Sequence, residues 1–231
     1  MKQYKYILFD LDHTLWDYDR NANEVLFDLY DKYELGGDGG YSADEFTKVF
    51  HKVNRHLWSL HDVGKIGRED IREGRFKRVL EQFDDRKVQL SGQLSDDYMY
   101  LCPRKTHTIP YAIEVLDYLH GKYRMYIVTN GFEDVQHIKI SGANLTHYFG
   151  EVITSEKAGY KKPSKEIFDH TLALDGAKPY EAIMIGDNLD TDILGARNAD
   201  IDTVYFNPDN SAHEQDVTHE IDCLSRLMNI L

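Results

Sequence analysis

The chain contains four short segments that each place a polar side chain of a catalytic type beside an apolar run. In chain order they are residues 7–14 (ILFDLDHT), 127–131 (IVTNG), 161–163 (KKP) and 185–192 (IGDNLDTD). Together they supply a carboxylate nucleophile, a second carboxylate two residues later, a hydroxyl group, a lysine and an acidic cluster. A phosphoryl-transfer site needs these groups, because it works by nucleophilic attack and by neutralising phosphate charge.

Asp10 and Asp12 follow an apolar run that ends at Phe9. A carboxylate that attacks phosphorus forms an aspartyl phosphate, which divides one difficult step into two easier ones. Asp10 is therefore the candidate nucleophile, and Asp12 can protonate the leaving oxygen and then activate water. Taken alone, the segment is also compatible with a turn followed by a helix cap.

Thr129, Asn130 and Gly131 follow a second apolar run. Their hydroxyl and backbone N–H groups can bind a substrate phosphate at the start of the next helix, although an ordinary helix cap fits the same segment. Lys162 can neutralise charge on a transferring phosphoryl group. Its neighbour Lys161 is interpreted as a solvated surface residue.

The last segment supplies three carboxylates, Asp187, Asp190 and Asp192, for a hard cation. Mg²⁺ typically uses one or two protein carboxylates together with phosphate and water. An EF-hand calcium loop is disfavoured because its central glycine and terminal glutamate are missing. Clustering of Asp10 and Asp12 with these carboxylates would cause strong repulsion without a divalent cation, so the sequence predicts a Mg²⁺ site.

Elements of alternating type must position these side chains. Short apolar runs predict buried strands at 6–9, 125–128, 152–153, 182–185 and 203–206. Helical spacing predicts helices at 110–120, 132–141, 164–174 and 190–198. This alternation is typical of an α/β fold with a Rossmann-like parallel sheet, in which ligands bind beyond the carboxyl ends of the strands.

A long helical segment interrupts this alternation after the first strand. Helices are predicted at about 21–35, 43–60, 68–83 and 91–101, with a flexible turn at Gly36–Gly40. We therefore expect a catalytic core of residues 1–17 and 104–231 and an inserted all-helical cap domain of residues 18–103.

Composition limits the function classes. The 231 residues are 42% hydrophobic and 29% charged, with a net charge of −13 and two cysteines that match no zinc or disulfide pattern. The negative charge argues against nucleic-acid and acidic-membrane partners. With no transmembrane or signal segment apparent, we expect a cytoplasmic protein acting on a small phosphomonoester, either as a monomer or as a dimer.

The four motifs, in this order, resemble those of the haloacid dehalogenase (HAD) superfamily, specifically its Mg²⁺-dependent phosphatases. The resemblance implies that Asp10 is both nucleophile and metal ligand, and that Asp187 completes the metal site. It implies that Asp12 is the acid/base and binds the metal through its backbone carbonyl. The name-giving dehalogenases lack this second aspartate and need no metal, so Asp12 argues against dehalogenation.

The resemblance also assigns supporting roles. Thr129 and Lys162 would hold the phosphoryl group. Asp192 would not bind the metal itself but would orient Lys162 or metal-bound water. The helical insertion is similar to a small cap that opens and closes over the site and selects the substrate.

At subgroup level, the chain resembles the YjjG-type noncanonical pyrimidine nucleotidases. His13 stands where many relatives carry glycine, and the stretch from Trp58 to Phe76 is similar to the cap of that subgroup. This implies a 5′-nucleotidase for pyrimidine nucleoside monophosphates, with Trp58 and Arg75 as cap residues that bind substrate. Trp16, if not simply packed in the core, is a further candidate for stacking on a base.

Two other functions remain open from the sequence. A sugar-phosphate phosphatase or phosphomutase uses the same parts. The cap of a phosphomutase must hold a second phosphate, which could be bound by Lys65, Arg68, Arg72 and Arg75. These cations also fit a solvated helix face that pairs with Glu69, Asp70 and Glu73. A receiver-like phosphoacceptor module is disfavoured, because receivers are near half this length and carry their acceptor on a later strand.

Overall fold

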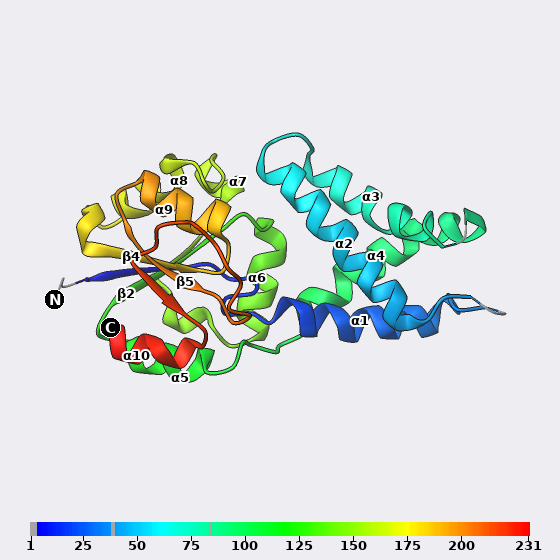
Figure 1. Ribbon diagram of the computed structural model, residues 1–231, viewed down its shortest axis with the longest axis horizontal. Coiled ribbons are helices and arrows are strands. Elements are labelled where there is room, and N and C mark those ends of the chain that lie inside the picture. The colour runs from blue at the N-terminus through cyan, green and yellow to red at the C-terminus, as the bar shows by residue number, and fades with distance from the viewer. Residues whose placement is uncertain (1–3, 38–39, 84) are drawn as a thin grey trace. The chain divides into compact units, whose positions relative to one another are not determined.

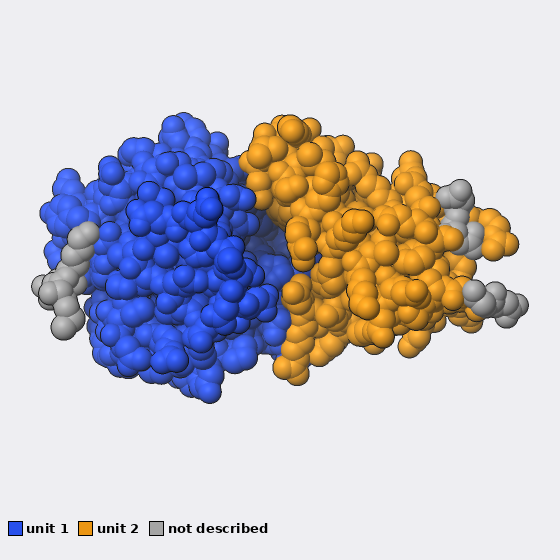
Figure 2. All heavy atoms as spheres, in the orientation of Figure 1, with its two compact units in different colours: residues 1–18, 106–231 blue, residues 19–105 orange. Residues whose placement is uncertain are grey.

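The computed structural model describes residues 4–37, 40–83 and 85–231, which form two compact units. Unit 1 comprises residues 1–18 and 106–231, and unit 2 comprises residues 19–105 (Figure 2). Among the described residues, no helix combines the length and the apolar character needed to cross a lipid bilayer.

Unit 1 contains a parallel sheet. Its strands are β1 (Tyr6–Phe9), β2 (Arg124–Thr129), β3 (Glu151–Thr154), β4 (Ala182–Gly186), β5 (Asp202–Phe206) and β6 (His219–Ile221). They lie in the order β3-β2-β1-β4-β5-β6, and every neighbouring pair is parallel. Phe9 is in register with Ile127 on one side and with Ile185 on the other, so β1, β2 and β4 end at the same edge.

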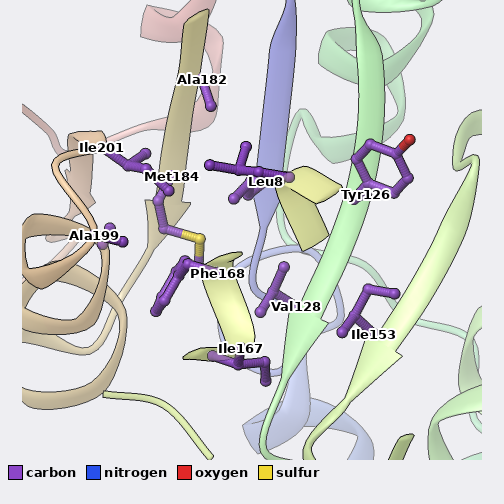
Figure 3. Close-up of a cluster of buried hydrophobic side chains, with 12 residues drawn as sticks. Leu8, Tyr126, Val128, Ile153, Ile167, Phe168, Ala182, Met184, Ala199 and Ile201 are labelled. Atoms are coloured by element: carbon purple, nitrogen blue, oxygen red, sulfur yellow. The ribbon is translucent and has the colours of Figure 1, made fainter. Parts of the chain in front are cut away.

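Continuous apolar strands form here because both faces of the sheet are covered. Successive side chains of a strand point to opposite faces. Leu8, Val128 and Met184 pack on one face with Ile167 and Phe168 of α8 (Figure 3). Helices α5 and α10 lie on the other face (Figure 1).

Six helices belong to unit 1: α5 (Ala112–Leu119), α6 (Glu133–Gly142), α7 (Ser155–Ala158), α8 (Lys165–Ala173), α9 (Leu194–Asn198) and α10 (Leu227–Ile230). Short helical turns join them at η3 (Thr146–Tyr148), η4 (Pro179–Glu181), η5 (Leu189–Ile193) and η6 (Leu224–Arg226). Of these, η5 is a π-helical turn, a geometry that is frequent at functional sites.

The described residues of unit 2 form helices joined by turns and loops, with no strand among them. Its elements are α1 (Tyr18–Lys32), α2 (Ala43–Asp62), α3 (Arg68–Leu80), η1 (Asp85–Leu90), α4 (Ser91–Leu101) and η2 (Cys102–Arg104). Helix α2 starts at a capping box, in which Ser42 and Glu45 bond each other's backbone N–H groups. Phe50, Phe76 and Tyr98 form an aromatic core between α2, α3 and α4.

The predicted fold class is confirmed: the structure is an α/β protein with a parallel sheet and a helical insertion after β1. The sequence missed β6, which is only three residues long, and the predicted helix at 190–198 begins as the π-helical turn η5. The predicted turn at Gly36–Gly40 includes Asp38 and Gly39, which lie outside the described residues.

Candidate active site

The carboxyl ends of three adjacent strands carry the polar side chains predicted from the sequence. Asp10 follows β1, Thr129 ends β2 and Asp187 follows β4. Asp10 continues the strand pairing, because its N–H donates to the carbonyl of Ile185 at 2.9 Å. Strands β2 and β3 follow β1 on one side of the sheet, whereas β4 lies on the other side of β1. Open α/β sheets bind ligands at such a switch point in strand order.

Lys162 lies at the centre of the site with only 2% of its surface exposed. Its Nζ donates to Asp10 Oδ1 at 2.5 Å, to Asp192 Oδ1 at 2.6 Å and to the carbonyl of Val128 at 2.8 Å. An ammonium group has three donors, and all three are used here. A direct bond from Lys162 to a phosphoryl group would therefore have to replace one of these contacts.

Asn130 holds the backbone of Lys162 in place. Its Nδ2 donates to the Lys162 carbonyl at 3.0 Å, and its Oδ1 accepts from the Lys162 N–H at 2.8 Å. The sequence predicts a substrate contact for Asn130, whereas the structure shows its side chain positioning the buried lysine.

Thr129 has an oriented hydroxyl group. Its Oγ1 accepts hydrogen bonds from the N–H of Gly131 at 3.0 Å and from Nε2 of Gln136 at 2.8 Å. A hydroxyl group has two acceptor positions, so both are filled and the O–H remains as a donor. In this structure the N–H of Gly131 donates to Thr129, and the phosphate contact expected of Gly131 stays a prediction.

Asp10, Asp187 and Asp192 form an acidic cluster in which one oxygen from each lies within 4.8 Å of the others. Asp192 is buried, and its Oδ2 accepts from the N–H of Asn188 at 3.1 Å while its Oδ1 accepts from Lys162. Both of its oxygens thus have protein donors, which suits a residue that orients Lys162. A Cβ on Gly186 would lie 2.3 Å from Asp192 Oδ2, so glycine is needed for this approach.

The acidic cluster has fewer positive groups nearby than it has carboxylates. Burial raises the pKa of Asp10 to about 7, although Lys162 opposes this shift. Burial likewise raises the pKa of Asp187 to about 6, although His13 opposes it. When ionised, the carboxylates of the site outnumber its buried ammonium groups by two. The carboxylates are those of Asp10, Asp12, Asp187 and Asp192, and the ammonium groups are those of Lys139 and Lys162. An oxygen-only donor set with two uncompensated negative charges fits a hard divalent cation.

Asp12 has two partners that sequence reasoning missed. Lys139 Nζ donates to both of its carboxylate oxygens, at 2.6 and 2.8 Å, and Gln136 Nε2 donates to Oδ2 at 2.9 Å. Burial alone would raise the pKa of Asp12, but these donors outweigh it and hold the pKa below its ordinary value. The available signal was Lys139 itself, since a lysine on the apolar face of a predicted helix is rarely buried without a partner.

His13 and Thr14 complete the loop after β1. Thr14 Oγ1 donates to Asp187 Oδ1 at 3.0 Å, which links this loop to the acidic cluster. His13 has a φ of 65°, in the left-handed region that favours glycine. Glycine would adopt this backbone geometry with less strain than the histidine that stands here.

The predicted cap residues Trp58 and Arg75 lie in unit 2. The Arg75 guanidinium is buried against the Tyr98 ring, 4.4 Å from its centroid, and Nη1 donates to Asn54 at 3.1 Å. Trp58 is half-buried on α2, with its ring 5.2 Å from that of His61. Arg75 therefore has structural partners in its own unit.

Comparison with known proteins shows the family of this chain. The profile of the haloacid dehalogenase-like hydrolases matches residues 4–200. This chain belongs to that family. The helices α1–α4 form the HAD cap, which is inserted after β1.

Individual relatives of this HAD hydrolase have different activities. Two pyrimidine 5′-nucleotidases are similar to it: PynA of Streptococcus pneumoniae, 30% identical over 89% of this chain and 84% of PynA, and YjjG of Escherichia coli, 28% identical over 89% and 87%. A ribulose-1,5-bisphosphate 5-phosphatase of Halopiger xanaduensis is 30% identical over 97% and 98%. The crystal structure of YfnB from Bacillus subtilis, bound to magnesium, has a TM-score of 0.87 at 27% identity and covers 99% of both chains.

The raised pKa values predict a pH-dependent effect of a cation on stability. Asp10 and Asp187 keep protons in the folded state that the unfolded chain, with a carboxyl pKa near about 4, has already lost. Their contribution to stability is therefore full below about pH 4 and is lost as the pH rises through about 6 to 7. A divalent cation replaces those protons, so Mg²⁺ should raise Tm more at pH 7.5 than at pH 5.

Thermal unfolding with Mg²⁺ or with chelator, at both pH values, measures this effect. Asp187→Asn should lose most of the gain at pH 7.5, whereas Asp190→Asn, an exposed neighbour, should keep it. An equal gain at both pH values would show that protons and cation do not share these carboxylates.

Proposed function

We propose that the protein is a Mg²⁺-dependent phosphomonoester hydrolase that works through an aspartyl phosphate on Asp10. The observation that carries the proposal is the Asp10 carboxylate, held at 2.5 Å by Lys162 inside an acidic cluster with two uncompensated negative charges. The carboxylates of Asp10 and Asp187, with the backbone carbonyl of Asp12, would hold the cation. Bound there, Mg²⁺ supplies a Lewis acid that offsets the charge on a phosphoryl group.

The chain's own residues then have distinct tasks. Asp10 attacks phosphorus, and the hydrogen bond from Lys162 fixes the direction of its carboxylate. Thr129 directs its O–H donor to a phosphoryl oxygen, because its acceptor positions are filled. Asp12 protonates the leaving oxygen and afterwards takes a proton from the attacking water.

Removing the nucleophile tests the mechanism. Asp10→Asn should lower kcat by roughly four orders of magnitude or more, because an amide is a poor nucleophile. Phosphate release from 4-nitrophenyl phosphate measures kcat, and acid quench with mass spectrometry looks for a phosphorylated Asp10. Asp190→Asn is the matched control in the same acidic segment and should stay near wild type. Full activity of Asp10→Asn, or wild-type activity undiminished by chelator, would refute the mechanism.

The two adjacent lysines provide a second test. Lys162→Ala should cost about 2–4 kcal/mol of transition-state stabilisation, the scale of losing one strong electrostatic contact. Lys161→Ala should change kcat/KM by less than about threefold, because Lys161 is only half-buried, whereas Lys162 is the lysine that contacts Asp10 and Asp192. Steady-state kinetics of both variants decides between them, and the reverse ranking would assign the role to Lys161.

For the substrate, we propose pyrimidine nucleoside 5′-monophosphates. Support comes from PynA and YjjG, which are pyrimidine 5′-nucleotidases, and from Trp58, a half-buried ring in unit 2 that offers a stacking surface. A sugar-phosphate phosphatase is the second candidate, because the ribulose-1,5-bisphosphate 5-phosphatase relative has the same level of identity. Substrate selection by the cap residues of unit 2 is part of this proposal.

A substrate panel separates the two candidates. Uridine and thymidine 5′-monophosphates should show higher kcat/KM than sugar phosphates, and Trp58→Ala should raise KM for the nucleotide several-fold while sparing 4-nitrophenyl phosphate. Exposed Tyr100, also in unit 2, gives the control substitution Tyr100→Ala. Sugar phosphates with tenfold higher kcat/KM than any pyrimidine nucleotide would replace the nucleotide assignment and leave the phosphatase chemistry intact.

A further inference from the structure

Helix α6 presents two donors to Asp12. Gln136 and Lys139 are three residues apart, so they lie on the same face of the helix. Together they donate three hydrogen bonds to the Asp12 carboxylate, with lengths of 2.6, 2.8 and 2.9 Å. Both oxygens of the carboxylate are therefore fixed in direction by groups that take no direct part in attack on phosphorus.

Lys139 is enclosed around this contact. It is 6% exposed, and its Nζ lies 4.6 Å from the Trp16 ring and 5.9 Å from the Tyr18 ring. Trp16 is tied to the same loop as Asp12, because its N–H donates to the Leu11 carbonyl at 2.8 Å. In the part of the chain that the structure describes, Asp12 is the carboxylate that pairs with Lys139. Cation–π contacts with the two rings thus hold the ammonium group beside Asp12.

Gln136 connects Asp12 to Thr129. Its Nε2 donates to both side chains, and its orientation is fixed because a carboxylate can only accept. The space it occupies depends on Gly131, where a Cβ would lie 2.1 Å from Nε2. Its Oε1 is buried without a hydrogen-bond partner, which costs free energy. In return, the side chain of Gln136 fixes the positions of Asp12 and Thr129 relative to each other.

We propose that Lys139 is a positioning residue for the two proton transfers of Asp12. The inference rests on the proposed function. In the first transfer, an Asp10 oxygen bonds to phosphorus, the P–O ester bond breaks, and its electron pair takes a proton from Asp12. In the second, water attacks the aspartyl phosphate and gives a proton to Asp12, while the Asp10–phosphorus bond breaks and restores the carboxylate. Lys139 holds Asp12 where both protons can pass.

The two transfers can be measured separately. A good leaving group such as 4-nitrophenolate departs without a proton, so kcat/KM for 4-nitrophenyl phosphate does not need the acid. An alkyl ester such as uridine 5′-monophosphate does need it. Hydrolysis of the aspartyl phosphate needs the base whichever ester formed it, and it enters kcat for both substrates.

Lys139→Met keeps much of the side-chain length and removes the ammonium group. It should lower kcat/KM for uridine 5′-monophosphate by about 10²-fold, and leave kcat/KM for 4-nitrophenyl phosphate within about threefold. Its kcat for 4-nitrophenyl phosphate should fall by about tenfold or more, with aspartyl phosphate accumulating in acid-quenched samples. Lys165→Met is the matched control, since Lys165 pairs with Asp169 on the surface and should match wild type in all three readouts.

Lys139→Gln keeps one donor and should lose less than Lys139→Met, and it serves as the second variant should the methionine variant fail to fold, which Tm reports. Equal losses of kcat/KM for both substrates would overturn the inference, because a general disturbance of the site makes no distinction between leaving groups. Unchanged kinetics would overturn it as well. Failure of the wild type to hydrolyse either ester would instead refute the proposed function.

Discussion

Buried negative charge at the carboxyl end of β1 is the constraint on which the site depends. Strand order brings Asp10 and Asp187 to one edge, and the turn η5 adds Asp192. Burying charge is costly unless it is paired and hydrogen-bonded, and a buried carboxyl group otherwise keeps its proton. The raised pKa of Asp10 expresses this conflict, because a protonated carboxyl group is no nucleophile. The positive and hydrogen-bonding groups around the site offset this negative charge.

Two buried lysines divide that task. Lys162 bridges Asp10 and Asp192, and Lys139 pairs with Asp12. Each arrangement uses an amide side chain as a brace: Asn130 holds the Lys162 backbone, and Gln136 holds the Asp12 carboxylate. Such support fixes reacting groups before substrate arrives, which lowers the entropy cost of reaching the transition state. The two remaining negative charges are left for a cation.

Unit 2 obeys a different constraint. Its helices cannot bury an apolar face against a sheet of their own, so aromatic rings of α2, α3 and α4 pack together. Arg75 is part of that core, with its guanidinium against Tyr98 and bonded to Asn54. A cap with its own core keeps its fold while its surface changes. The relatives of similar identity include a pyrimidine 5′-nucleotidase and a ribulose-1,5-bisphosphate 5-phosphatase.

The sequence by itself determined the α/β class, the helical insertion and the strand ends that carry Asp10, Thr129 and Asp187. These follow from local patterns, since a fully covered parallel strand must be a continuous apolar run and its carboxyl end faces the ligand edge. The sequence also indicated Lys162 as a site residue, but it did not indicate which contacts bury this side chain.

Only the tertiary structure decided which side chains support the site. The pair Lys139–Asp12 joins residues 127 positions apart, and that contact depends on where α6 lies on the sheet. Asn130 illustrates the same limit, because its segment suits a phosphate contact and the structure turns its side chain to Lys162. Periodicity describes one element at a time, whereas the order of strands and the packing of helices determine which elements meet.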